Sequence, residues 1–248
     1  MTKAMLITGA SRGIGAATAR LAAKAGYDVL VNYVSDKAAA DKVVADVEAA
    51  GRRAVAGQAD MAKPDDVARL FADHDRAFGR LDAFVNNAGI VGPAIRVDEV
   101  DIARLERMIA INVTGAFLAC GEAVRRMSTR HGGTGGAIVN LSSVAARLGG
   151  PGEYVDYSAT KGFIDTLTIG LGKEVAAEGI RVNAVRPGLI YTDIHASAGR
   201  PNRVDEMASG VPIKRGGTAE EVAETIVWLC SDAASYVLAS LIDVTGGR

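Results

Sequence analysis

Tyr157 and Lys161 lie four residues apart in the stretch DYSATKG, a segment with helical spacing. Positions i and i+4 share one helix face, so spacing alone also fits an ordinary pair on a solvated helix. Lowering the pKa of a phenol from about 10 to near neutrality takes roughly 4 kcal/mol of stabilisation of the phenolate. One ammonium about 4 Å away supplies on the order of 4 kcal/mol at an effective dielectric constant of about 20. The pair could therefore transfer a proton, given a pocket and a reacting partner.

A second candidate site is TGASRGIG, residues 8–15, with glycines at Gly9, Gly13 and Gly15. The stretch follows a short apolar run and opens a segment with helical spacing. A tight turn, close backbone approach and a helix N-terminus with free N–H groups suit a bound pyrophosphate. An ordinary strand-to-helix turn is the alternative, but the spacing, the chain position and the following helix all favour the anion site.

Alternating apolar runs and helical patterns predict the elements that position these residues. Seven short apolar runs read as strands buried on both faces: AMLIT, DVLVNY, RAVAG, LDAFVNNAG, GAIVNLSS, IRVNAVRPG and LIDVTGG. Helical patterns cover Ile14–Ala25, Lys37–Ala50, Pro64–Phe78, Asp101–Ser128, Tyr157–Glu178 and Ala219–Cys230. This alternation predicts an α/β fold, a doubly wound parallel sheet of the Rossmann type with helices on both faces.

The organisation of the chain indicates one domain over residues 1–248, because no linker, repeat or low-complexity tract divides it. The exception to the regular pattern is a stretch rich in Ser, Gly, Pro and Arg before the last helix. A stretch of this length without strong periodicity is typical of a functional lid. We call residues 193–215 the lid segment.

Composition argues against several functions. The net charge of -1 provides no overall field for nucleic acid or an acidic membrane. The sequence predicts no signal peptide and no apolar run that approaches a membrane span. The two cysteines, Cys120 and Cys230, and the three histidines are scattered, which predicts no disulfide framework and no metal site. A reducing, cytoplasmic setting is the simplest expectation.

Further motifs, each at an expected element, accompany the glycine turn: NNAG (86–89), INVTG (111–115), VNLSS (139–143), YSATK (157–161) and RVNAVRPG (181–188). Together they resemble the short-chain dehydrogenase/reductase family, in its glucose dehydrogenase and 3-oxoacyl-carrier-protein reductase-like branch. The resemblance covers nearly the whole chain. It implies a seven-stranded parallel sheet, a nicotinamide cofactor, hydride transfer between a carbonyl and a secondary alcohol, and a homotetramer.

The resemblance also implies roles for four residues. Tyr157 would be the acid and base, and Lys161 would lower its pKa and hold the nicotinamide ribose. Ser143 would polarise the substrate oxygen, and Asn112 would anchor a water in a proton relay. Ser142 is a rival to Ser143, because only one of two adjacent hydroxyls at a strand end faces the substrate. Asn112 could instead satisfy backbone groups, and Tyr157 could be a partly buried aromatic.

For the cofactor, the resemblance favours NADP(H), with NAD(H) possible. The second strand ends in Tyr33, where NAD-dependent relatives carry an acidic residue, and Arg12 could face a 2′-phosphate with Ser35 and Lys37 assisting. Asp36 nearby and Val34 in place of a common arginine leave this preference open. The complete expected set of cofactor contacts is Gly9, Ser11, Arg12, Gly13, Ile14, Gly15, Asn32, Tyr33, Ser35, Asp60, Met61, Asn87, Ala88, Gly89, Tyr157, Lys161, Pro187, Gly188, Ile190 and Thr192.

The substrate is expected to be a small carbonyl or alcohol whose pocket is shaped by the lid segment and the loop after Ser143. The candidates to contact it are Arg147, Glu153, Tyr154 and His195. The simpler interpretation is that each of them is a solvated loop residue. One alternative is reduction of a 3-oxoacyl group on an acidic carrier protein, docked on the basic cluster at residues 125–131. The same cluster at a helix end also suits the helix macrodipole, which is the interpretation we favour. The other alternative is a non-catalytic protein that senses NADP(H).

Overall fold

The computed structural model describes residues 2–248, apart from the side chains of His195 and Ser197. In this part of the chain seven parallel strands form one sheet in the order β3-β2-β1-β4-β5-β6-β7, which confirms the predicted fold. The strands are β1 (Lys3–Ile7), β2 (Tyr27–Tyr33), β3 (Ala54–Gln58), β4 (Ala83–Asn86), β5 (Gly136–Leu141), β6 (Ile180–Pro187) and β7 (Leu241–Val244). The strand order reverses between β1 and β4, where doubly wound sheets bind ligands.

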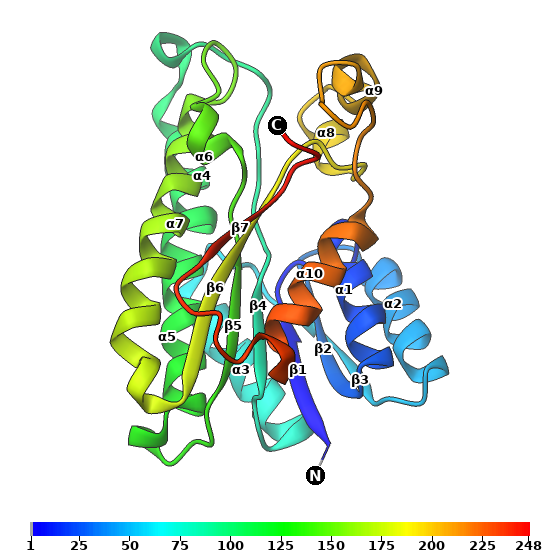
Figure 1. Ribbon diagram of the computed structural model, residues 1–248, viewed down its shortest axis with the longest axis vertical. Helices are drawn as coiled ribbons and strands as arrows, with labels where there is room; N and C mark the ends of the chain where they lie inside the picture. The colour runs from blue at the N-terminus through cyan, green and yellow to red at the C-terminus, as the bar shows by residue number, and fades with distance from the viewer. Residues whose placement is uncertain (1) are drawn as a thin grey trace.

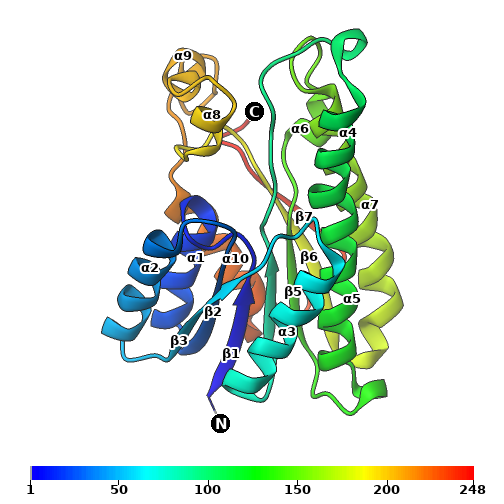
Figure 2. The same ribbon diagram turned by 180° about the vertical axis from the view of Figure 1, so that it is seen from behind.

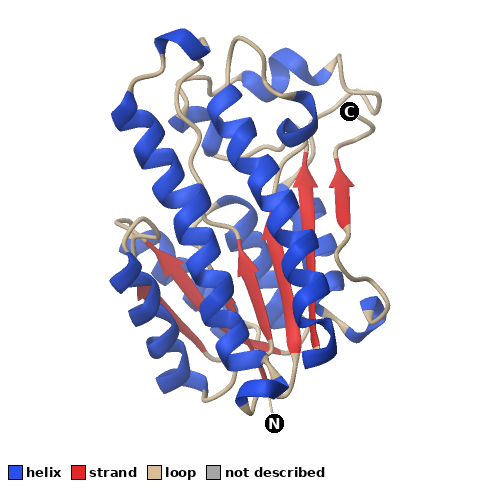
Figure 3. Ribbon diagram, turned by 90° about the vertical axis from the view of Figure 1, so that its left-hand side faces the viewer, coloured by secondary structure: helices blue, strands red, loops and turns tan. Residues whose placement is uncertain are grey.

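Helices cover both faces of the sheet (Figures 1 and 2). One layer consists of α1 (Gly13–Lys24), α2 (Lys37–Ala49) and α10 (Ala219–Cys230). The other consists of α3 (Pro64–Phe78), α4 (Ile102–Ile109), α5 (Ala116–Met127) and α7 (Val155–Val175). Three short helices that the sequence did not predict, α6 (Ala145–Leu148), α8 (Ile194–Ser197) and α9 (Arg203–Ala208), are labelled in Figure 1 and lie beyond the carboxyl ends of the strands, whose arrows point toward them in Figure 3.

The core is divided by the sheet into two apolar clusters. Met5 and Ile7 of β1 face α1 and α10, whereas Leu6 between them packs on the layer of α3 and α5. All three side chains are fully buried, as expected of a parallel sheet covered on both faces. This two-sided burial explains why the strands appear in the sequence as continuous apolar runs.

The long helix predicted over Asp101–Ser128 is present but contains a π-helical turn, Ala110–Gly115, between α4 and α5. A Cβ atom at Gly115 would lie 2.0 Å from the carbonyl oxygen of Met61, so a glycine is needed for the helix to pass this loop. By length and composition alone, the stretch Ile102–Met127 could cross a membrane, contrary to the sequence expectation. Here it packs against α3 and α7 on the sheet, which is the position of a core helix.

Candidate active site

The turn between β1 and α1 is held by two asparagine side chains. Asn32 Oδ1 accepts a hydrogen bond from Gly9 N (2.9 Å), and its Nδ2 donates to carbonyls at the end of β3. Asn87 Nδ2 donates to the carbonyls of Thr8 (2.7 Å) and Gly9 (3.0 Å). Thr8, which sequence reasoning did not assign, accepts from the backbone N–H of Asn87 and Ala88. The side chain of Asn32, expected to contact the cofactor, is thus engaged in supporting the turn.

The glycines of this turn fit a closely approaching anion. Gly9 and Gly13 have φ of 61° and 55°, a left-handed conformation that favours glycine. A Cβ at Gly15 would lie 2.5 Å from the Gly9 carbonyl oxygen, so a side chain there would push the helix away from the turn. Arg12 precedes α1 and its side chain does not cap the helix. The N–H groups at this N-terminus are therefore placed to meet a pyrophosphate.

Tyr157, Lys161 and Ser143 come together where β5 ends beside α7. Lys161 is 5% exposed, its Nζ donates to the Leu141 carbonyl (2.6 Å), and Nζ lies 5.6 Å from the centre of the Tyr157 ring. The Ser143 hydroxyl forms a hydrogen bond with Tyr157. Ser142 points the other way, with its hydroxyl 2.7 Å from Asp165 Oδ1. Of the two rival serines, Ser143 is therefore the one beside the phenol.

The electrostatics of Tyr157 differ from the sequence expectation. Burial raises the pKa of Tyr157 to about 12, and the hydrogen bond from Ser143 only partly offsets this effect. Burial also lowers the pKa of Lys161 to about 8, against the opposing charge of Asp165. The expectation treated the ammonium as the dominant influence on the phenol. In the protein alone desolvation is larger, because both groups are enclosed by the fold.

Asn112 lies in the π-helical turn and is buried. Its Oδ1 accepts from Ile90 N and its Nδ2 donates to the Ile90 carbonyl, both at 2.9 Å, and to Thr160 Oγ1 at 3.2 Å. The side chain thus joins the loop after β4 to α7. A Cβ at Gly89 would lie 3.4 Å from Asn112 Oδ1 and 3.5 Å from Lys161 Nζ, so these two polar atoms approach the same point beside the backbone.

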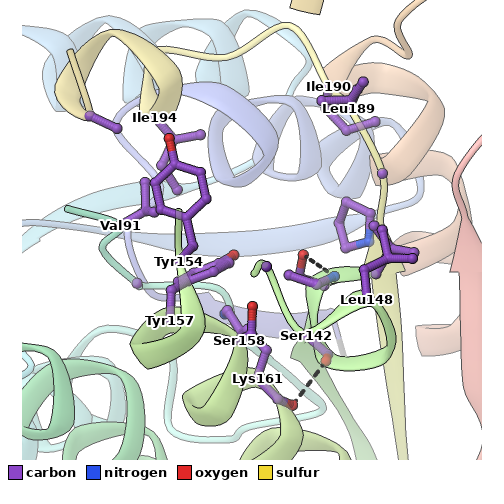
Figure 4. Close-up of a pocket in the computed structure, with 18 of the residues that line it drawn as sticks. Val91, Ser142, Leu148, Tyr154, Tyr157, Ser158, Lys161, Leu189, Ile190 and Ile194 are labelled. Atoms are coloured by element: carbon purple, nitrogen blue, oxygen red, sulfur yellow. Dashed lines mark hydrogen bonds between the residues drawn. The ribbon is translucent and has the colours of Figure 1, made fainter. Parts of the chain in front are cut away.

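A cavity of about 480 Å³ connects these groups (Figure 4). Tyr154, Tyr157, Ser158 and Lys161 line one side of it, and Leu189 and Ile190 line another. The cavity brings together the following predicted site residues: Ile14, Asn87, Gly89, Ser143, Tyr157, Lys161, Pro187, Gly188, Ile190 and Thr192. Asn112 does not line the cavity. It supports this wall through its hydrogen bond to the Ile90 carbonyl.

Comparisons with known proteins agree with this geometry. Residues 9–248 match a protein-family profile described as enoyl-(acyl carrier protein) reductase. The chain is 56% identical over 243 residues to the uncharacterized oxidoreductase YgfF of Escherichia coli K12, covering 98% of both proteins. The structure of 3-ketoacyl-(acyl-carrier-protein) reductase from Brucella melitensis, complexed with NADH, superposes with a TM-score of 0.91 at 31% identity, over 99% of this chain and 98% of that one.

A short-chain dehydrogenase from Burkholderia cenocepacia in complex with NADP gives a TM-score of 0.90 at 33% identity, over 99% of this chain and 97% of that one. The chain belongs to the short-chain dehydrogenase/reductase family. It is accordingly an NAD(P)-dependent oxidoreductase that acts on carbonyl or CH–OH groups. Ile14 of the glycine turn lines the same cavity as Tyr157 and Lys161 of this short-chain dehydrogenase/reductase.

The lid segment of this short-chain dehydrogenase/reductase is tied across the cavity by ion pairs. Glu153 accepts from Arg200 Nη1 and Arg203 Nη2, both at 2.7 Å, and Arg200 also pairs with Glu206. The Arg203 guanidinium lies 4.8 Å from the centre of the Tyr154 ring, and both residues line the cavity. Glu153 and Tyr154 are thus part of the wall. Arg147 pairs with Asp243 instead, and the His195 side chain lies outside the described residues.

The predicted adenosine end of the site lies at the ends of β2 and β3. Tyr33 is 7% exposed, whereas Arg12 and Ser35 lie on the surface. Asp36, which left the cofactor preference open, caps α2 by accepting from Ala39 N (2.9 Å). Asp60 Oδ2 lies 3.2 Å from Arg107 Nη1. Among the described residues no cluster of His, Cys, Asp and Glu could hold a metal ion.

Proposed function

We propose that this protein is an NADP(H)-dependent enzyme that interconverts a small carbonyl compound and its secondary alcohol, with Tyr157 as the acid and base. The observation that carries the proposal is the meeting of Tyr157, Ser143 and Lys161 on one wall of a cavity reached from the glycine turn. When bound, the nicotinamide supplies or accepts hydride at the substrate carbon. The residues of the chain then have to handle one proton at the substrate oxygen.

In this proposal the Tyr157 hydroxyl gives the proton to the substrate oxygen in reduction and removes it in oxidation. Ser143 donates a hydrogen bond to the same oxygen, which favours the charge that develops there. The Lys161 ammonium stabilises the phenolate left on Tyr157. Asn112 and Lys161 converge beside Gly89, and we assign the proton relay to this point.

The preference for NADP(H) is assigned to Arg12. Its guanidinium is exposed at the start of α1, and the second strand offers no carboxylate at Tyr33 that would repel a 2′-phosphate. The Asp36 carboxylate accepts a hydrogen bond from Ala39 N at the start of α2, so it is less available to bind the ribose hydroxyls of NAD(H). Lys37, which could have assisted, pairs with Asp41 at 2.7 Å.

Replacing Arg12 with Ala is expected to raise KM for NADPH by roughly 10- to 100-fold, because a charge-assisted hydrogen bond contributes about 1.5–3 kcal/mol. KM for NADH should change by less than about threefold, since NADH lacks the phosphate. Steady-state rates with both cofactors measure the effect. Equal increases for both cofactors would show that Arg12 supports the turn and does not read the phosphate.

The negative charge of Glu153, which pairs with Arg200 and Arg203 of the lid segment, is expected to set the affinity for substrate. Glu153→Gln keeps the size of the side chain but leaves the buried Arg203 without its anion, so the wall loosens. We expect KM for substrate to rise about tenfold, corresponding to about 1.4 kcal/mol, with little change in KM for NADPH. Glu206→Gln is the matched control, because among the residues that the structure describes Glu206 forms an ion pair with Arg200 and none with Arg203. Similar effects of both substitutions would exclude a role for the Glu153–Arg203 pair.

Reduction of a 3-oxoacyl group on a carrier protein is a second candidate, supported by the named activity of the Brucella protein and, for the carrier protein alone, by the family description. The basic cluster at residues 125–131 weakens it. Arg125 pairs with Glu122 at 2.6 Å, while Arg126 pairs with Asp75 and stacks on Phe71. Intramolecular pairing leaves less charge for an acidic partner. A non-catalytic sensor is disfavoured, because the four expected catalytic residues are all present.

We also propose a cytoplasmic homotetramer. Phe117 is 56% exposed, its ring lies 6.5 Å from that of Phe163, and Ile109 nearby is also exposed. Near the C-terminal strand, Tyr236 and Leu238 are exposed as well. Two apolar surfaces of this kind suit the two interfaces of a tetramer. Cys120 and Cys230 are free and buried, and burial raises the pKa of both thiols to about 12, which fits a reducing compartment.

The proposed function is tested with a panel of uncharged ketones, aldehydes and secondary alcohols, together with 3-oxoacyl thioesters with and without a carrier protein. Nicotinamide absorbance is followed with NADPH, NADH and their oxidised forms. We expect turnover of a free carbonyl compound, with NADPH preferred. Turnover restricted to carrier-bound thioesters would select the second candidate, and binding of NADPH without any turnover would support the sensor.

A further inference from the structure

Asp165 is a buried carboxylate one helical turn beyond Lys161 on α7, outside the motifs that indicated the site. It is 8% exposed. Its Oδ1 accepts from Ser142 Oγ at 2.7 Å, and its Oδ2 accepts from Arg186 Nη2, also at 2.7 Å. The carboxylate is therefore held on two sides, by the end of β5 and by β6. These two partners offset the cost of burying the carboxylate and fix its position beside the catalytic wall.

Ser142 connects this carboxylate to the catalytic wall. Its hydroxyl lies 2.7 Å from Asp165 and 3.2 Å from the Lys161 carbonyl, while its backbone N–H donates to Val185 of β6 at 2.9 Å. The end of β5 is thus held so that the Ser142 side chain faces Asp165 and the Ser143 side chain faces Tyr157. Lys161 and Asp165, at i and i+4, share the α7 face that meets β5.

The surroundings of Lys161 contain few other charges. Its ammonium bonds to the neutral carbonyl of Leu141, and Asn112 opposite is also neutral. On β6, Arg186 is turned to Asp165, and on β7 Asp243 lies 3.6 Å from Arg186. At the start of α7, Asp156 is paired with Arg104 of α4 at 2.7 Å. Among the described residues the other titratable group beside the ammonium is Tyr157, whose ring centre lies 5.6 Å from Nζ.

We propose that Asp165 is a positioning residue of the active site, aimed by Ser142 and Arg186 so that its negative charge keeps the buried Lys161 in the ammonium form. The proposal rests on the proposed function, in which that ammonium stabilises the Tyr157 phenolate and contacts the cofactor. Burial lowers the pKa of Lys161, and Asp165 acts in the opposite direction. Without the carboxylate, Lys161 would lose its proton at a lower pH and activity would decline with it.

The test is the pH dependence of kcat and of NADPH affinity in Asp165→Asn. Asparagine keeps the shape and can still accept from Ser142, but it removes the charge. We expect the alkaline decline of kcat, and the weakening of NADPH binding with pH, to begin at a pH lower by on the order of one unit. Asp165→Glu restores the charge and should return the profile most of the way to that of the wild type.

Asp243→Asn is the matched control, because it removes the other carboxylate near Arg186 and leaves Asp165 paired. Its pH profile should match the wild type. If Asp165→Asn does not fold, Ser142→Ala, which keeps the charge but frees the carboxylate, should shift the profile by a smaller amount in the same direction. An unchanged profile in a folded Asp165→Asn protein, or an equal shift in Asp243→Asn, would overturn the proposal.

The same measurements separate this proposal from the proposed function. NADPH affinity is followed by cofactor fluorescence and does not need turnover. A wild-type protein without turnover on any carbonyl would overturn the proposed function, while the binding profile would still decide the role of Asp165. A wild-type protein with turnover and an Asp165→Asn variant with the same two profiles would overturn only the inference about Asp165.

Discussion

Tyr157→Phe is expected to lower kcat by about 10³-fold, within the roughly 10²- to 10⁴-fold range of general acid–base catalysis, while the dissociation constant of NADPH changes by less than about twofold. The substitution removes one oxygen atom and leaves the ring against Lys161. Cofactor affinity is then carried by the glycine turn and Lys161, which are unaffected. Stopped-flow or steady-state absorbance measures the rate, and fluorescence titration measures the binding.

The pKa of Tyr157 decides when the phenol can give up its proton. Lowering it from about 12 in the protein alone to about 7 requires about 7 kcal/mol. An ammonium about 4 Å away supplies on the order of 4 kcal/mol. The remainder has to come from other positive charge near the phenol, so we expect Tyr157 to become acidic only in the complex with oxidised cofactor. Tyrosinate absorbance, as the difference between wild type and Tyr157→Phe, follows this titration.

Tyr236→Phe is the matched control for the missing hydroxyl, because Tyr236 is fully exposed. It should keep the wild-type kcat. A Tyr157→Phe protein with turnover within about tenfold of the wild type would remove Tyr157 from the proton transfer.

The second large effect concerns His74, a buried side chain far from the site. Within the described part of the chain neither ring nitrogen has a hydrogen-bond partner, and the ring packs edge-on against Phe78. Burial lowers the pKa of His74 to about 4. An unfolded chain protonates its histidine near pH 6.5, so between about pH 6.5 and pH 4 the unfolded state binds one more proton than the folded state. The free energy of unfolding should therefore fall by about 3 kcal/mol as the pH decreases through this window.

His74→Leu is expected to remove this part of the pH dependence, because leucine is neutral at every pH and fits an apolar site. Urea unfolding of both proteins at pH 7 and pH 4.5 gives the comparison, with the wild type losing more stability than the variant. His131→Leu is the control, since His131 is exposed. An identical loss in wild type and His74→Leu would mean that His74 is already protonated in the folded protein.

The strands were predictable because a sheet covered on both faces needs continuous apolar runs, and all seven runs contain strands of one sheet. The long helices were also predicted. The π-helical turn at Asn112 was not, because it depends on close packing of Gly115 against Met61, which no local pattern reveals. The short helices of the lid segment were missed for a similar reason: α8 and α9 have four and six residues, too few to show a period.

For the site, motif spacing led to Tyr157, Lys161 and Ser143, which the fold brings together. It did not indicate which partners would bond to each side chain. The side chain of Asn32, expected to contact the cofactor, supports the turn, and Glu153, a candidate substrate contact or solvated loop residue, bonds to the lid segment. The pKa of Tyr157 was misjudged because enclosure by the rest of the fold has no signature in the sequence near the residue.

The ion pairs that hold the lid segment also have a consequence for how the protein responds to its surroundings. The Glu153 side chain is 35% exposed and those of Arg200 and Glu206 are 33% and 51% exposed, so dissolved ions reach them. Salt screens such pairs, over a Debye length of about 8 Å at physiological ionic strength. The lid segment is thus held more firmly in dilute buffer than in concentrated salt, and ionic strength becomes a means of varying access to the cavity without changing a residue.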